Sequence, residues 1–79
     1  MSPAEALECA AARAERQTTA GAAIREALAF TDRYYPGPRV LGEARHCDEA
    51  VSLAIVLARR CARPADVAEV FRRAAEVAP

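Results

Sequence analysis

The sequence predicts an all-α protein, a small antiparallel bundle of three helices in a single domain that spans residues 1–79. Three observations predict this class. Alanine supplies 21 of the 79 residues, and Arg, Leu and Glu, which also favour helix, are frequent. No stretch alternates apolar and polar residues in the way that a half-buried strand does. Prolines at positions 36, 38 and 64 divide the chain into three segments, because proline cannot continue a helix.

The first helix is predicted to begin almost at the first residue. Residues 2–5, Ser-Pro-Ala-Glu, match a capping box with proline in the first helical position. The helix then runs toward residues 31–33. Within it, residues 17–21 combine two threonines and a glycine, which lower helical propensity. Either the helix continues through this stretch with a bend, or Thr18 or Thr19 caps a second segment; we expect continuation, and therefore one long first helix.

The second helix follows a turn at residues 34–38, Tyr-Tyr-Pro-Gly-Pro. No standard N-cap marks its beginning, which we place between residues 39 and 43, and we expect it to end near residues 61–62. Its segment 50–58 is apolar almost all round, which is typical of a helix that is covered on several sides. We therefore expect this helix at the centre of the bundle.

The third helix is predicted to begin at Arg63-Pro64-Ala65-Asp66, with proline in the first helical position and an acid in the first turn. It is amphipathic. Its apolar stripe consists of Val67, Val70, Phe71, Ala74, Val77 and Ala78. On the opposite face, the spacing of four residues predicts a Glu69–Arg73 pair and an Arg72–Glu76 pair.

The two final helices resemble a single tetratricopeptide-type helical pair over residues 48–79. The resemblance is carried by the 62–64 turn, Phe71, Ala74 and Pro79. The sequence departs from that pattern at Ile55, Ala58 and Ala62, and it holds no second copy of the pair, whereas such arrays normally need about three. What the resemblance implies is limited to an antiparallel hairpin.

Bulky hydrophobic residues are unevenly distributed. Only 18 hydrophobic residues are larger than Ala or Cys, and 16 of these lie in residues 24–79. The first half of the first helix offers mostly alanine, with small or apolar residues repeated at intervals of seven. Either this half packs thinly at the edge of the bundle, or it contacts a partner. We expect a homodimer that buries the first helix or one side of the second.

Five residues are the candidate partner-binding set: Leu7, Ala11, Ala14, Tyr34 and Tyr35. The tyrosines admit two interpretations. One ring plugs the open end of the bundle while the other lies on the surface, or the pair anchors a partner, since Tyr is enriched at interface hot spots.

Composition narrows the function to a protein–protein interaction or regulatory accessory module. The chain has 11 cations and 11 acids, so no net charge draws it to nucleic acid or an anionic membrane. One His, two Ser and three Cys suggest no nucleophile with its base, and three isolated glycines form no phosphate loop. We expect no enzyme activity, no cofactor and no membrane span. The odd, irregularly spaced cysteines and the lack of a signal-peptide pattern indicate the cytoplasm.

A dimeric helix-turn-helix DNA-binding regulator is the second hypothesis. Its basic patch would consist of Arg59, Arg60, Arg63, Arg72 and Arg73. Against it, the would-be recognition helix also carries Glu69 and Glu76, and its first turn holds Asp66.

A metal-binding bundle is the third hypothesis. Glu43 and His46 form a Glu-x-x-His half-motif of the kind found in carboxylate-bridged metal sites, and Cys47 follows directly. The second carboxylate would have to come from Asp32 in the facing helix. A single half-motif is a weak signal, and no Cys-x-x-Cys zinc half-site is present, so no metal ligands are assigned.

Overall fold

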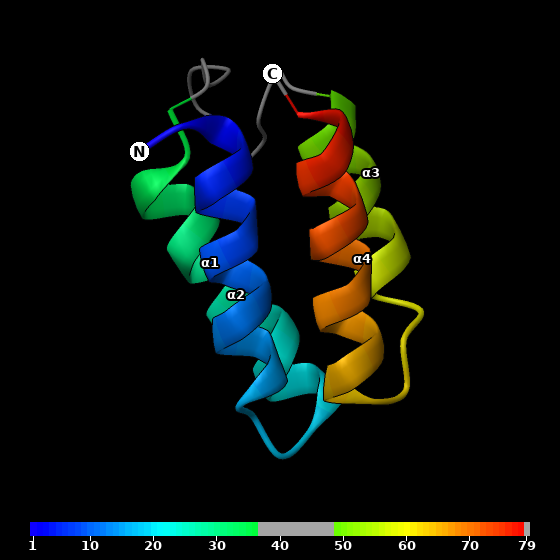
Figure 1. The fold of residues 1–79 in the computed structure, drawn as a ribbon. Coiled ribbons are helices and arrows are strands. Elements are labelled where there is room, and N and C mark those ends of the chain that lie inside the picture. The colour runs from blue at the N-terminus through cyan, green and yellow to red at the C-terminus, as the bar shows by residue number, and fades with distance from the viewer. Residues whose placement is uncertain (37–48, 79) are drawn as a thin grey trace, which may run out of the picture.

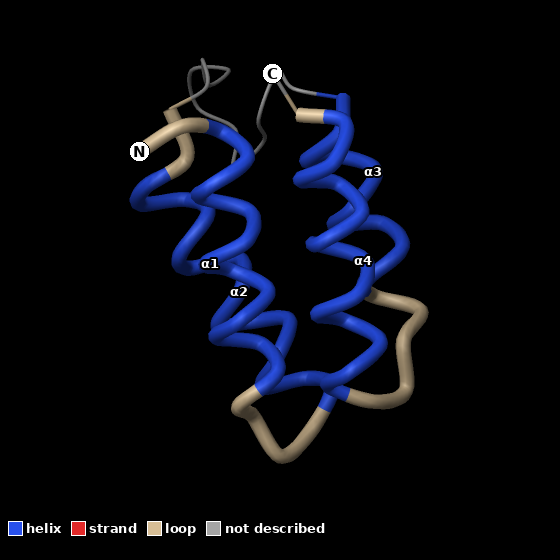
Figure 2. Tube along the Cα trace, viewed as in Figure 1, coloured by secondary structure: helices blue, strands red, loops and turns tan. Residues whose placement is uncertain are grey.

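The computed structural model describes residues 1–36 and 49–78, and every regular element in these ranges is helical (Figures 1 and 2). This confirms the all-α class, but the described residues form four helices rather than the three that we expected. The helices are α1 (Pro3–Glu15), α2 (Ala20–Tyr34), α3 (Glu49–Ala58) and α4 (Pro64–Val77).

The four helices form two antiparallel hairpins, α1–α2 and α3–α4, which lie against each other (Figure 1). The α1–α4 contact is the most extensive in the molecule, and α3 contacts mainly α4 and α2 only slightly. The N-terminus and the end of α4 lie at one end of the bundle. The 16–19 and 59–63 connections lie at the other end.

The predicted long first helix is two helices, and this corrects our expectation of continuation. α1 ends at Glu15, and Thr19 caps α2: its backbone is extended, and its Oγ1 accepts a hydrogen bond of 3.1 Å from the Ala22 backbone N–H. The capping alternative was therefore the correct one. Two capped helices are more stable here than one continuous helix, because the break lets α2 fold back along α1 and bury a second apolar stripe.

The beginnings of α1 and α4 are as the sequence predicts. The Glu5 backbone N–H donates to Ser2 Oγ at 3.1 Å and the Ser2 N–H donates to Glu5 Oε1 at 3.3 Å, so the capping box is complete. Pro64 occupies the start of α4, where Arg63 is the N-cap and donates from Nε to Asp66 Oδ2 at 3.1 Å.

The predicted beginning of α3 lies outside the described residues. Its end differs from the expectation, because α3 stops at Ala58 rather than near residues 61–62. The Arg60 and Cys61 N–H groups donate to the carbonyls three residues back, which tightens the chain into a turn. Residue 63 precedes a proline and is driven toward extended backbone, so residues 59–63 are used to reverse direction.

Alanine dominates the contact between α1 and α4. Ala6, Leu7, Ala10, Ala11 and Ala14 are all 0% exposed. On α4 the buried residues are Val67, Ala68, Phe71, Ala74 and Ala75. Small side chains let two helix axes approach closely, so backbone and Cβ atoms supply the packing contacts that larger side chains would otherwise make. The alanine-rich first helix is therefore completed by the chain's own α4.

α3 lies at the edge of the bundle, which corrects the prediction that the apolar second helix is central. Only three of its residues, Val51, Ala54 and Ala58, are buried. Two helices with narrow, well-matched faces pack closely in the middle, and the helix that is apolar on every side is left with one covered side.

None of the helices in the described ranges is long and apolar enough to cross a membrane.

Candidate functional site: an exposed apolar face on α3

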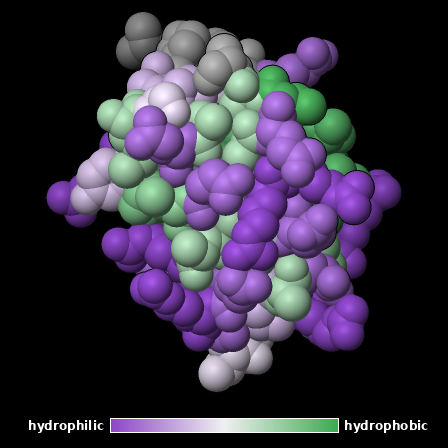
Figure 3. All heavy atoms as spheres, in the orientation of Figure 1, coloured by the Kyte–Doolittle hydropathy of each residue, from purple (hydrophilic) through white to green (hydrophobic). Residues whose placement is uncertain are grey.

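Most of the large exposed hydrophobic side chains of the described residues lie on α3 and on the last turn of α4. There are four of them, and we call them the α3 face: Leu53 (58% exposed), Val56 (49%), Leu57 (41%) and Val77 (75%). In Figure 3 the most hydrophobic atoms gather along the edge where α3 lies beside α4. The spacing of 53, 56 and 57 places these residues on one side of the helix, opposite the buried Val51, Ala54 and Ala58.

A shallow apolar groove of about 160 Å³ runs between α3 and α4 beside this face. Its walls are apolar except for Arg73: Ala50, Leu53, Ala54 and Leu57 from α3, and Val70, Ala74 and Val77 from α4. Val77 belonged to the predicted core stripe of the last helix. It is instead exposed, because the last turn of α4 extends along the open side of the groove.

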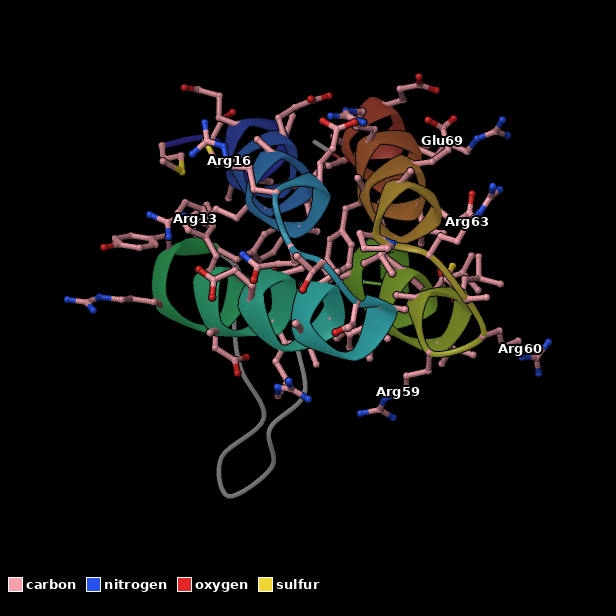
Figure 4. The ribbon with its side chains drawn as sticks, turned by 90° about the horizontal axis from the view of Figure 1, so that it is seen from below. Arg13, Arg16, Arg59, Arg60, Arg63 and Glu69 are labelled. Carbon is pink, nitrogen blue, oxygen red and sulfur yellow. The ribbon has the colours of Figure 1, made fainter. Side chains whose placement is uncertain are left out.

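Charged residues stand at both ends of α3. Glu49 is exposed in its first turn, and Arg59 and Arg60 are exposed in the turn after its last residue. Figure 4 shows both arginines extending outward from the end of α3. Within the described ranges, neither arginine has an ion pair.

The other arginines of the predicted nucleic-acid patch are engaged with carboxylates. Arg72 holds Glu15 of α1 through two hydrogen bonds, of 2.6 and 3.3 Å. This replaces the predicted Arg72–Glu76 pair, because α1 packs beside α4 and offers a closer carboxylate. Those hydrogen bonds and the guanidinium charge lower the pKa of Glu15.

The remaining two arginines of the patch make local pairs. Arg73 Nε donates to Glu69 at 3.0 Å, which confirms the predicted pair at four-residue spacing, and Arg63 pairs with Asp66. Of the five arginines proposed for nucleic acid, Arg59 and Arg60 are therefore the two without a described partner.

Most of the predicted partner-binding residues face the interior. Leu7, Ala11 and Ala14 are 0% exposed and Tyr35 is 5% exposed, so in this fold a partner would reach them only if the helices separated. Tyr34 alone lies on the surface, 45% exposed, with its ring centroid 4.7 Å from that of Phe30. One tyrosine ring is thus buried and the other lies at the surface.

The aromatic pair at the end of α2 is surrounded by arginine. The Arg13 guanidinium lies 5.0 Å from the Phe30 ring centroid, and that of Arg33 lies 5.5 Å from the Tyr34 ring centroid. Arg13 also pairs with Glu26 at 3.1 Å. The Arg13 contacts tie α1 to α2, and each ring has one guanidinium lying against it.

The candidate metal half-motif at Glu43, His46 and Cys47 lies outside the described residues. Among residues 1–36 and 49–78, no three metal-ligating side chains come together.

The two described cysteines, Cys9 and Cys61, are unpaired and partly buried. Burial, followed by the nearby Asp66 charge, raises the pKa of the Cys61 thiol. A raised pKa disfavours the thiolate, so Cys61 has the character of a small apolar side chain rather than of a nucleophile.

The dimer surface predicted from the sequence was the first helix or one side of the second, and no residues of the second helix were chosen for it. The all-round apolar segment was the available signal, and it indicates equally a central helix or an edge helix with one uncovered side. No family model, curated protein or solved structure matches this chain.

Proposed function

We propose that this chain is a small helical protein–protein interaction module without catalytic chemistry of its own. Its binding surface is the α3 face together with the adjoining α3–α4 groove, and its partner is a second copy of the chain or a larger protein. The cytoplasm is the proposed location, since the unpaired Cys9 and Cys61 remain thiols in a reducing compartment.

The observation that carries the proposal is the concentration of exposed apolar side chains on one surface. The described residues include six large exposed hydrophobic side chains, and four of them form the α3 face. Single exposed hydrophobic residues are ordinary, but contiguous apolar patches beside a groove are characteristic of binding surfaces. Because these leucines are already about half-buried, covering the exposed part of one contributes about 1 kcal/mol, and several must be covered together to hold a partner.

A DNA-binding regulator has less support. Arg72 and Arg73 already pair with Glu15 and Glu69. Affinity for DNA grows with the number of phosphates that a protein neutralises. Two unpaired arginines at one end of α3 can neutralise few phosphates, so they would contribute little affinity.

Site-specific photo-crosslinking tests the proposed function. A benzoyl-phenylalanine replaces Leu53 in the full chain expressed in its native cell, and in a control it replaces Ala12, which is exposed on α1. We expect protein adducts from position 53 and none from position 12. Leu57→Gln in the same chain should lower the yield, whereas Ala65→Gln should not. An absence of adducts from position 53 would contradict the interaction function.

A further inference from the structure

The uncovered side of α3 carries an ordered sequence of charge and hydrophobicity. Glu49, Leu53 and Val56 succeed one another on α3 at intervals of four and three residues, which places them along one side of a helix with 3.6 residues per turn. Arg60 follows four residues later, in the turn just after the end of α3 at Ala58. All four are exposed. From one end to the other, α3 and the turn after it present an acid, two apolar residues and a base.

This order of charged and apolar residues is self-complementary when two copies of the helix lie antiparallel. Glu49 and Arg60 lie equally far from the midpoint between residues 54 and 55, as do Leu53 and Val56. If two such helices run antiparallel, each Glu49 faces the Arg60 of the other copy and each Leu53 faces a Val56. A parallel pair would instead bring like charges together at both ends.

We propose that the α3 face binds a second copy of this chain, with the two α3 helices antiparallel about a two-fold axis that passes between residues 54 and 55. This inference rests on the proposed function and adds the partner, the orientation and the register. A two-fold interface uses the same patch on both copies, so every contact is made twice.

The apolar centre and the charged ends act together in selecting this partner. An acid at the beginning of a helix and arginines at its end also stabilise the helix dipole, so the charges alone select nothing. Between them, however, lie Leu53 and Val56, about half of whose surface is exposed. The groove beside them, with Val77 on its far wall, adds apolar surface for the other copy.

Sedimentation equilibrium of the full chain from micromolar to millimolar concentration is the first measurement, and we expect a monomer–dimer equilibrium. Glu49→Arg and Arg60→Glu, made separately, should each weaken the dimer by roughly tenfold or more, because two attractive pairs become repulsive. An equimolar mixture of the two variants should associate again, because the heterodimer joins opposite charges at both ends.

Matched controls reverse charges elsewhere. Glu8→Arg in α1 and Arg16→Glu just after it change the net charge by the same amounts at exposed positions, and they should leave the dissociation constant within about twofold. Leu53→Gln combined with Val56→Gln should weaken the dimer by at least about 100-fold, since four apolar side chains lose their cover. Circular dichroism of each variant verifies that its helices are intact.

The possible outcomes separate the inference from the proposed function. A monomer at every concentration overturns the second copy as partner, and if position 53 still cross-links to a different protein, the interaction module stands. A monomer without adducts overturns both. A dimer that is insensitive to the changes at positions 49, 53, 56 and 60 places the contact elsewhere and overturns the antiparallel α3 pairing.

Discussion

Two regions of the molecule reverse the usual relation between hydrophobicity and burial. The α1 half of the α1–α4 contact is built from alanines and one leucine, and its inward side is completely buried. α3 consists almost entirely of apolar residues, yet Leu53, Val56 and Leu57 are exposed to roughly half their extent.

Burial of a helix in this fold therefore depends on which helix faces match, and not on how apolar the helix is. α1 and α4 each present one narrow stripe of mostly small residues opposite a charged face, so they approach closely over their whole length. α3 has no polar side that would fix which of its faces is buried. It packs onto the bundle through three buried residues, Val51, Ala54 and Ala58. The excess apolar surface remains available for binding.

The largest expected loss of stability comes from removing a large side chain from the core beside α1. Phe71 is completely buried, and Phe71→Ala should lower the free energy of unfolding by about 3–5 kcal/mol. Leu53→Ala, on the exposed face, should change it by less than about 0.5 kcal/mol in dilute protein. Urea unfolding followed by circular dichroism measures both. Equal losses would mean that the α3 face is buried in the folded monomer.

Introducing a larger side chain at the alanine contact between α1 and α4 should lower the free energy of unfolding by less than the loss of Phe71 does. Ala10 is 0% exposed, and Ala10→Leu inserts atoms where α1 and α4 are in close contact, which should destabilise the chain by about 1–3 kcal/mol. Ala12→Leu, on the exposed side of the same helix, is the control and should have almost no effect. Thermal unfolding of the two variants compares them; a tolerated Ala10→Leu would refute the close approach.

Removing the cap between α1 and α2 should have an effect of about 1 kcal/mol. Thr19→Ala leaves the Ala22 N–H without its hydrogen-bond acceptor at the beginning of α2. Thr18→Ala, one residue earlier and also exposed, should be nearly neutral. If the two threonine variants unfold at the same urea concentration, Thr19 does not fix the break that leaves α1 free to lie along α4.

The smallest effect concerns the Glu15–Arg72 pair, which bridges α1 and α4 at the surface. Because this pair lowers the folded-state pKa of Glu15, its contribution to stability is complete above the ordinary value of 4.5 and is lost as pH falls through the lowered pKa. Glu15→Gln should therefore lower the melting temperature near neutral pH and match the wild type in strong acid. Glu76→Gln, which removes another exposed carboxyl group, is the control. A difference in melting temperature between Glu15→Gln and the wild type that does not change with pH would contradict this role.

Local signals in the sequence were sufficient for much of the fold. The Ser2 capping box, Pro64 at the start of α4 and the Glu69–Arg73 pair are short-range features, and the structure confirms each of them. The break at residues 16–19 was misjudged because capping and continuation have nearly equal local energies. The packing of α2 back onto α1 decides between them.

The candidate site was predictable only in part, for the same reason. Arg72 lies within reach of Glu76 along its own helix and of Glu15 across the bundle, and only the arrangement of the helices shows that Glu15 is its partner. Likewise, the sequence predicts Leu7 at a partner interface and leaves Leu53, on the apolar second helix, unassigned. The structure covers the first and exposes the second.

The helical character of the described residues, the beginnings of α1 and α4, and the predominance of alanine among the apolar residues of the first third could all be predicted from the sequence. These properties follow from propensity, capping and composition, which act over a few residues. The burial of the alanine-rich helix and the edge position of the most apolar helix depend instead on how the helices pack against one another. Close packing stabilises helices whose surfaces are complementary, and complementarity is a property of two helices together.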